Sequence, residues 1–190
     1  MILILSLLLQ SHNIIRDQKE TSGSCGADVT WSYDNTTYTI TITGSGKMND
    51  YSIENKAPWY AYDDPIVILK VENGVTSIGT YAFYDCKILI STTIPDSVTS
   101  IGKYAFSYCS NFNDISISGV TSIGDSAFYF CVKLKTVSIP GVTSIGDSAF
   151  SICNNLKTLS IPDSVTYIGK YAFSNCNKLE SVKLPTNNIT

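Results

Sequence analysis

The chain has 190 residues and a formal net charge of −3, and its length suits one domain with short appendages. This charge gives no electrostatic reason to expect a nucleic acid or an anionic membrane as partner. The only arginine is Arg16 and the only histidine is His12, so from residue 21 onward the chain offers neither a guanidinium group for phosphate nor an imidazole for acid–base catalysis. Most classes of enzyme are therefore excluded.

The chain begins with a short apolar run, M-I-L-I-L-S-L-L-L-Q over residues 1–10. A bilayer-spanning helix needs about 20 residues, so we expect no membrane insertion of the mature chain. The run is typical of the apolar core of a secretory signal peptide, but no positive segment precedes it and no A-x-A-like cleavage site follows. A truncated or misassigned start is the alternative. We assign residues 1–20 to a signal peptide or leader and expect the polar stretch up to Ser24 to be cleaved or disordered.

Residues 21–64 lack the repeat found further along the chain and show alternation instead. Apolar side chains occupy every second position on either side of an Asp34-Asn35 turn, which predicts a β-hairpin. Because the first repeat of a solenoid exposes an apolar face, we expect this module to be an N-terminal cap. Trp31 and the segment Ala57-Pro58-Trp59-Tyr60 are predicted to cover that face. An aromatic ligand site at these residues is the alternative.

Residues 65–190 are built from a repeat of 22 or 23 residues. Each copy carries V-T-x-I-G, then an Ala-Phe pair, a cysteine, and an apolar-x-x-apolar-x-apolar run; copies start at Val75, Val98, Val120, Val142 and Val165. Leucine-rich repeats have periods of roughly 20 to 29 residues. We therefore predict a right-handed leucine-rich-repeat solenoid of about five to six repeats, with a parallel β-sheet on the concave face and short helical turns on the convex side.

The positions within one repeat have separate expected roles. In the strand, Val137 and Ile139 are predicted to point into the core while Thr136 and Ser138 point outward. Asp147 is expected to cap a single helical turn, whose buried face carries Ala149 and Phe150. The five repeat cysteines should form a buried column without metal or other cofactor, because no paired C-x-x-C ligands exist. Cys25, outside the repeats, is either free or paired between chains.

The last predicted strand spans residues 179–184, and no C-terminal cap is visible after it. An open solenoid end presents apolar side chains and an unpaired strand edge. We expect either that the natural protein continues or that two chains meet there as a homodimer.

The pattern L-x-x-V-x-I-P-x-x-V-T-S-I-G-x-x-A-F-x-x-C over residues 66–185 resembles the BspA-like (Treponema pallidum type) leucine-rich repeats. The segments C-G-A-D-V-T-W-S-Y, G-S-G-K-M-N-D-Y and A-P-W-Y resemble the module that precedes such arrays. The family comprises surface or secreted proteins of mucosal microbes, including protozoa such as trichomonads. The resemblance implies a non-catalytic protein-binding module, adhering to host cells or extracellular matrix or acting in co-aggregation. This chain departs from long members in its few repeats and in lacking a carboxy-terminal anchor.

Two surfaces are candidates for ligand binding. One is the hydroxylated outer face of the strands, including Thr136, Ser138, Thr158 and Ser160; the simpler interpretation is that these residues keep the sheet soluble. The other is an aromatic cluster of the early repeats, which is either an exposed ridge of the kind interfaces use or partly core: Tyr81, Tyr84, Tyr104, Tyr108, Tyr129 and Phe130. In a secreted eukaryotic protein, the sequons at Asn35 and Asn188 would also be glycosylation sites.

Three other functions remain open at the level of the sequence. The array could be a structural spacer or a self-assembly module that dimerises through its C-terminal repeat. An enzyme would have to use scattered carboxylates such as Asp125 and Asp147, which occupy equivalent repeat positions and are explained by capping. The Thr-x-Ser pattern also occurs in ice-binding solenoids, but those require a flat face.

Overall fold

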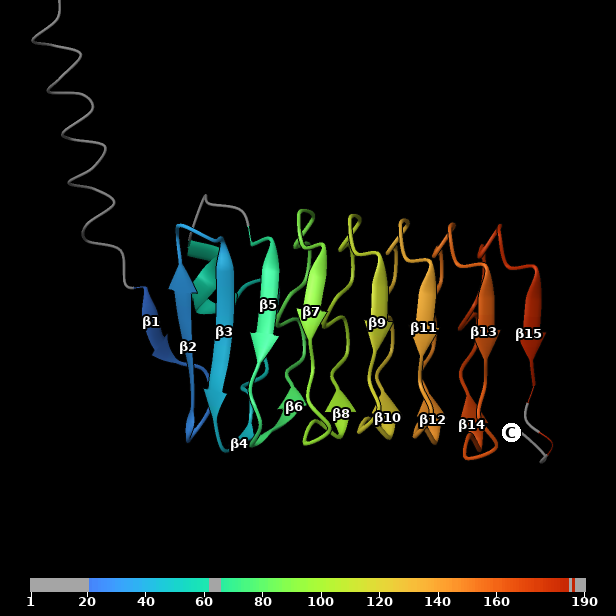
Figure 1. Cartoon of the computed structure of the whole chain (residues 1–190), viewed down its shortest axis with the longest axis horizontal. Coiled ribbons are helices and arrows are strands. Elements are labelled where there is room, and N and C mark those ends of the chain that lie inside the picture. Colours follow the sequence, from blue (N-terminus) through green and yellow to red (C-terminus); the bar gives the residue numbers. More distant parts are fainter. Residues whose placement is uncertain (1–20, 62–65, 185, 187–190) are drawn as a thin grey trace, which may run out of the picture.

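The computed structural model describes residues 21–61, 66–184 and 186. The chain forms a β-solenoid of about five turns whose coils stack along one axis (Figure 1). This confirms the predicted repeat solenoid. The signal peptide assigned to residues 1–20 and the sequon at Asn188 lie outside the described residues.

The solenoid begins with three antiparallel strands that form the N-terminal cap. β2 (Val29–Asp34) and β3 (Thr39–Gly44) make the predicted hairpin, and β3 pairs in parallel with β5 (Ile68–Val71) of the first repeat. The expectation of a leader reaching Ser24 is wrong, because β1 (Ser22–Ser24) pairs with β2. Gly23 makes this pairing possible, since a Cβ there would come within 3.0 Å of the Trp31 indole nitrogen.

Each repeat contributes one strand to each of two sides of the solenoid. The first side continues from β5 through β7 (Ser91–Thr93), β9 (Asp114–Ser116), β11 (Thr136–Ser138), β13 (Thr158–Ser160) and β15 (Ser181–Lys183). The second side is a sheet of short parallel strands: β4 (Gly46–Lys47), β6 (Val75–Ile78), β8 (Ser100–Ile101), β10 (Ser122–Ile123), β12 (Ser144–Ile145) and β14 (Tyr167–Ile168).

The first side divides into two sheets between β7 and β9. Thr92 of β7 takes the inward position that Leu69 has in β5. Its hydroxyl is buried and finds no hydrogen-bond partner among the described residues. A polar side chain therefore interrupts the apolar column at the place where the pairing ends.

The third side carries the Ala-Phe segments, and here the predicted helical turns are wrong. The described residues contain only one short helix, the 3-10 helix η1 (Pro58–Ala61) of the cap. In the Ala-Phe segments, every second backbone N–H donates to the next repeat, as from Phe106 to the Ala127 carbonyl at 2.8 Å. Asp147 likewise caps no helix; its carboxylate accepts the Lys170 backbone N–H at 2.7 Å. The bonds between coils alternate with turn bonds inside the coil, as from Ala105 to the Gly102 carbonyl at 3.2 Å, so no continuous helix forms.

A stack of phenylalanine rings fills the core from the first repeat to the last described one. The rings of Phe83, Phe106, Phe128, Phe150 and Phe173 lie 5.0–5.6 Å apart with interplanar angles of 5–14°. Trp59 continues the stack into the cap, 5.1 Å from Phe83 at 12°. The predicted capping role of the Ala57–Tyr60 segment is confirmed by this contact and by the edge-on contact of Trp59 with Trp31 at 6.0 Å.

The repeat cysteines form the predicted column and are free thiols. From the second repeat on, each Sγ donates to the phenylalanine carbonyl of the preceding repeat, as from Cys131 to Phe106 at 3.2 Å. Cys25 is also free and fully buried, and burial raises its pKa to about 12, so a disulfide between folded chains at this position has no structural support. In the described part of the chain, no group of three or more His, Cys, Asp or Glu side chains could hold a metal ion.

Candidate binding surface

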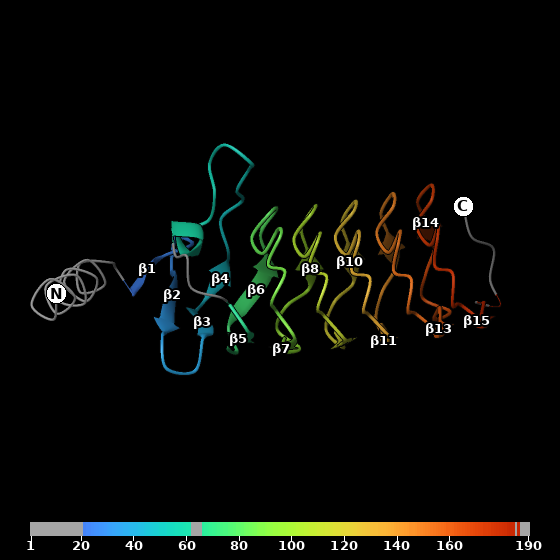
Figure 2. The ribbon, with the colours of Figure 1, turned by 90° about the horizontal axis from the view of Figure 1, so that it is seen from above.

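The six aromatic residues of the early repeats come together on the third side of the solenoid. They occupy the turns after β6, β8 and β10, and we call them the tyrosine ridge: Tyr81, Tyr84, Tyr104, Tyr108, Tyr129 and Phe130. In Figure 2 these turns lie on the side away from the β5–β15 strands, and the segment between β4 and η1 projects on the same side. All six side chains are half-buried. They are thus neither core nor fully exposed.

The rings of the tyrosine ridge touch one another both within and between repeats. Tyr81 stacks on Tyr104 with centroids 4.7 Å apart, and Tyr108 contacts Tyr84 at 5.6 Å and Tyr129 at 5.4 Å. Phe130 lies 5.1 Å from Tyr108. Aromatic pairs at these separations are mutually attractive. The ridge is therefore a continuous aromatic surface over three successive coils.

The backbone holds the ridge in place through an unusual conformation. Residues at two equivalent positions of every turn have positive φ, including Tyr104 at 56° and Tyr108 at 64°. Their N–H groups donate to the next coil, from Tyr104 to Asp125 at 3.0 Å and from Tyr108 to Tyr129 at 2.8 Å. Non-glycine residues rarely adopt a positive φ, because it strains the backbone. The hydrogen bonds between coils must therefore stabilise the turn by more than this strain costs. The tyrosines are consequently fixed on a rigid frame before any ligand arrives.

A groove runs along the ridge, parallel to the solenoid axis. It has a volume of about 380 Å³, and tyrosines and serines make up most of its lining: Ile53, Tyr81, Tyr84, Tyr104, Tyr108, Ser126, Tyr129 and Ser148. No charged side chain among the described residues lines it. We call this channel the aromatic groove.

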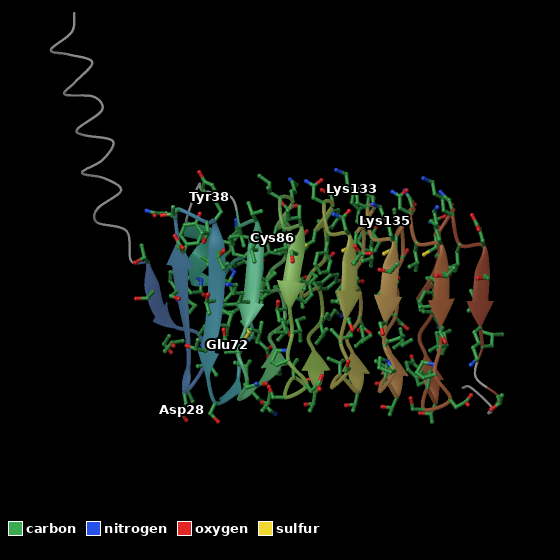
Figure 3. All side chains as sticks on the ribbon, in the orientation of Figure 1. Asp28, Tyr38, Glu72, Cys86, Lys133 and Lys135 are labelled. Atoms are coloured by element: carbon green, nitrogen blue, oxygen red, sulfur yellow. The ribbon has the colours of Figure 1, made fainter. Side chains whose placement is uncertain are left out.

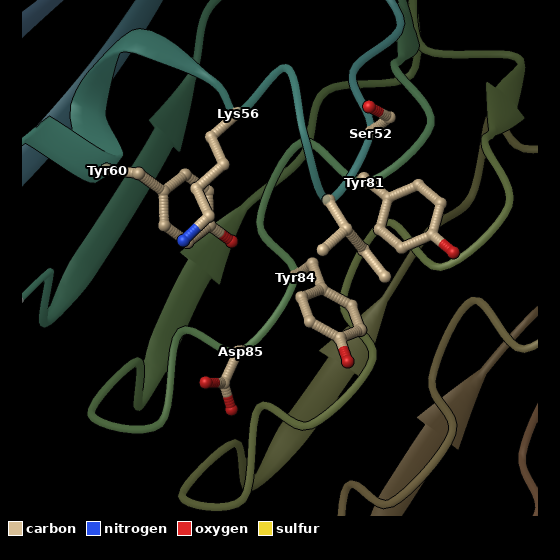
Figure 4. Close-up of a pocket in the computed structure, with 7 residues that line it drawn as sticks. Ser52, Lys56, Tyr60, Tyr81, Tyr84 and Asp85 are labelled. Carbon is tan, nitrogen blue, oxygen red and sulfur yellow. The ribbon is translucent and has the colours of Figure 1, made fainter.

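A smaller pocket of about 220 Å³ lies at the end of the aromatic groove that faces the cap. Its walls come from two elements, as Figure 4 shows: Lys56 and Tyr60 from the cap, and Tyr81, Tyr84 and Asp85 from the first repeat. Ile53, which is 55% exposed, lines both the pocket and the groove. We call this hollow the end pocket. Charged side chains meet the aromatic rings there, and on the ridge the Lys103 ammonium also lies 5.4 Å from the centroid of the Tyr104 ring.

The phenol groups of the ridge are hydrogen-bond donors at neutral pH. Partial burial and the neighbouring tyrosines raise the pKa of Tyr81 and of Tyr108 above the ordinary value. Burial raises the pKa of Tyr60 much further, and its hydroxyl contacts the Cys86 sulfur at 3.8 Å. The surface therefore combines apolar rings with neutral O–H groups.

The hydroxylated strand residues form a separate surface, on β11 and β13. Thr136 pairs with Thr158 across the two strands, and Ser138 and Ser160 also point outward. The Thr136 hydroxyl donates a hydrogen bond to the Asp114 carboxylate. Charged side chains such as Lys133 and Lys135 lie toward the rim of this face (Figure 3). The outward side chains on these two strands, which we call the strand face, are thus small and polar, and none of them is aromatic.

Two other sets of predicted residues have local explanations. The Asp125 carboxylate accepts the Asp147 backbone N–H at 3.0 Å and pairs with Lys103 at 3.4 Å, so it serves the contact between coils. Asn35 is exposed at the hairpin turn, where Asp34 accepts hydrogen bonds from Thr36 and Thr37. An exposed turn is accessible to glycosylation.

Sequence reasoning missed the contribution of the cap to this surface. Ser52, Ile53 and Lys56 belong to a polar, non-repeating stretch whose position depends on how the chain returns from β4 to η1. The one signal was Ile53, a large apolar residue isolated between polar neighbours.

Comparison with known proteins is consistent with this architecture. Residues 59–157, more than half of the chain, match the family described as "BspA type Leucine rich repeat region (6 copies)". The crystal structure of a leucine rich repeat protein of T. pallidum superposes with a TM-score of 0.62 at 29% identity, covering 82% of this chain and 68% of that one. No curated protein matches the chain.

Two further solved structures are longer than this chain. A leucine rich cell surface protein from Faecalibacterium prausnitzii gives a TM-score of 0.51 at 26% identity, covering 87% of this chain and 55% of that one. A leucine-rich repeat protein from Eubacterium ventriosum gives 0.50 at 26% identity, with coverage of 81% and 35%. The chain therefore spans about half or less of these two proteins.

Proposed function

The chain belongs to the BspA-type leucine-rich repeat family, and from this we propose that it is a non-catalytic module that binds a protein through the tyrosine ridge. The partner would be a host cell-surface or extracellular-matrix protein, or a surface protein of another microbe in co-aggregation. The single observation that carries the proposal is the continuous, half-buried aromatic surface over three coils.

Physical chemistry favours the ridge over the strand face. Tyrosine is enriched among the residues that dominate binding energy, whereas serine and threonine are not. Its ring supplies a large contact area with few rotatable bonds, and the ordered backbone removes much of the entropy cost of binding. The strand face offers hydrogen bonds alone. We therefore place the ligand on the third side of the solenoid.

A secreted or surface location is part of the proposal. One similar structure is that of a cell surface protein, and the described residues contain no helix that is long and apolar enough to cross a membrane. If the source is a eukaryote, glycosylation at Asn35 is compatible with this location, because the hairpin turn lies in the cap and away from the ridge.

The test is binding of the full chain to purified matrix proteins and to intact host cells, measured by biolayer interferometry and flow cytometry. The ridge variant carries Tyr104→Ser, Tyr108→Asn and Tyr129→Ser, which are residues that other coils already hold at the same positions: Ser126, Asn175 and Ser107. We expect the affinity to fall by about tenfold or more, as for truncated hot-spot residues.

The matched control changes the strand face by Thr136→Ala and Thr158→Ala. We expect it to bind like the parent chain. Loss of binding in this control, with the ridge variant unaffected and both variants equally stable, would assign the ligand to the sheet instead.

A second candidate function is self-assembly. Val182 and Leu184 are exposed apolar residues in the last described repeat, and β14 and β15 each pair on one side only within the described chain. A homodimer through this repeat would cover them. Light scattering over a range of concentrations tests it, and a monomeric mass at the highest concentration would exclude it.

A further inference from the structure

One interval along the aromatic groove restricts what can lie in it. Successive coils are separated by the spacing of paired strands, about 4.8 Å, so every second coil recurs after about 9.6 Å. Tyr84 and Tyr129 occupy the same turn position two coils apart, with the buried Ser107 between them. The groove therefore presents one pair of equivalent tyrosines at this longer interval, and the Tyr108 ring contacts both.

This interval matches one conformation of a bound peptide. A polyproline II helix has three residues per turn and rises 3.1 Å per residue, so its faces recur every ~9.3 Å. In a β-strand, side chains on one face recur every ~6.7 Å, which does not match the interval between Tyr84 and Tyr129. We propose that the aromatic groove binds a proline-rich segment of the partner in the polyproline II conformation, with prolines three residues apart on Tyr84 and Tyr129.

The chemistry of the groove agrees with such a ligand. Polyproline II backbones make no internal hydrogen bonds, so their carbonyl groups are free to accept from the tyrosine hydroxyls. Tyrosine hydroxyls are protonated donors at neutral pH, and the raised pKa of Tyr81 and of Tyr108 extends this state to higher pH. Proline rings are apolar and rigid, and aromatic-lined grooves are a recurring way to recognise them. The inference rests on the ridge being the protein-binding surface and adds the class of segment that it recognises.

Charge distinguishes the groove from its end. The groove is lined by no charged side chain in the described chain, which suits an uncharged proline-rich segment. The end pocket places the Asp85 carboxylate at the cap end, where its Oδ2 pairs with the Lys87 ammonium at 3.2 Å. Lys56 also lines this pocket, and a basic residue of a ligand can reach Asp85 through the second carboxylate oxygen, which the Lys87 ion pair does not use. We accordingly place a basic residue of the ligand, flanking the prolines, beside Asp85.

The experiment is fluorescence polarisation with the full chain and three labelled peptides. The first peptide is Arg followed by three Ala-Pro-Pro triplets, the second lacks the Arg, and the third replaces every Pro by Gly. We expect the first to bind about tenfold or more tighter than the third. Removing the Arg should weaken binding in the parent chain but not in an Asp85→Asn variant. Equal binding of the proline and glycine peptides, or no binding of either, would overturn the inference.

Variants locate the site. Tyr84→Ser with Tyr129→Ser should weaken the first peptide by about tenfold or more, since each removes a ring from the groove while introducing a residue that Ser107 and Ser151 already provide in other coils. Tyr171→Ser is the matched control, because Tyr171 is 74% exposed and does not line the groove. Equal weakening by the control would place the site elsewhere.

A competition assay separates this inference from the proposed function. If a protein partner binds through the ridge and the first peptide does not compete, the proposed function stands and the proline-rich ligand is wrong. If the peptide binds the groove while no matrix or cell-surface protein does, the ligand class stands and the adhesive role is wrong.

Discussion

At the scale of the residue, Trp59 shows how a non-repeating side chain completes a repeating structure. In each later coil, the Ala carbonyl of the Ala-Phe pair accepts the backbone N–H of the preceding phenylalanine, as Ala105 accepts from Phe83 at 2.8 Å. The first repeat has no such predecessor, and Trp59 Nε1 donates to Ala82 at 2.8 Å in its place. One side chain thus supplies both the ring and the donor of an absent coil.

Because Trp59 has two roles, two substitutions at this position should lower the unfolding free energy by different amounts. Trp59→Phe keeps a ring for stacking on Phe83 but leaves the buried Ala82 carbonyl without its donor, which should cost about 1 to 3 kcal/mol of unfolding free energy. Trp59→Ala also opens a cavity and should cost about 3 to 5 kcal/mol. Urea unfolding followed by circular dichroism measures both. If Trp59→Phe matched the parent chain, the indole hydrogen bond would contribute nothing.

At the scale of the element, the turn on the third side is the part that the sequence predicted least well. The buried positions Ala149 and Phe150 follow from the period alone, since apolar residues recur there in every repeat. The positive φ of Tyr104 and Tyr108 carries no such signal, because that conformation is usually marked by glycine or asparagine. The hydrogen bonds that impose it come from the next coil, and a single repeat does not encode them.

The same turn controls the reactivity of the cysteines. Alkylation requires the thiolate, and burial raises the pKa of Cys86 to about 12 and that of Cys131 higher still. Cys176, in the last described coil, is half-buried. We expect iodoacetamide at about pH 8, near the usual thiol pKa, to modify Cys176 first and the other repeat cysteines only on unfolding, as mapped by mass spectrometry. Modification of Cys131 as fast as Cys176 in the native state would contradict the assigned core.

At the scale of the whole molecule, the repeat fixes the core while the irregular parts form the candidate site. The columns of valine, isoleucine, phenylalanine and cysteine were predictable because each coil must bury the same face against its neighbours. The aromatic residues of the ridge could be named as candidates because they cluster in the early repeats, between the core columns. That Ile53 and Lys56 of the cap lie beside these rings could not be predicted. The path of the cap segment that carries them depends on its contacts with the first coil and not on the repeat.

The stacked core also determines how the molecule unfolds. Phe128 is fully buried between Phe106 at 5.4 Å and Phe150 at 5.0 Å, so Phe128→Ala should cost about 3 to 5 kcal/mol. For a chain of this length, that loss lowers the melting temperature by about 6 to 20 °C. Solenoids need roughly three coils to be stable, and a break at Phe128 leaves too few on either side. We therefore expect one transition.

Two probes test this cooperativity. Both tryptophans, Trp31 and Trp59, lie in the cap, so their fluorescence reports on that end while far-UV circular dichroism reports on all coils. In Phe128→Ala the two signals should share one lowered midpoint, because the cap depends on the coils that it covers. Phe130→Ala, a half-buried ridge position, is the control and should shift the midpoint much less. Separate transitions for the two probes would mean that the cap and the first repeats fold as an independent unit.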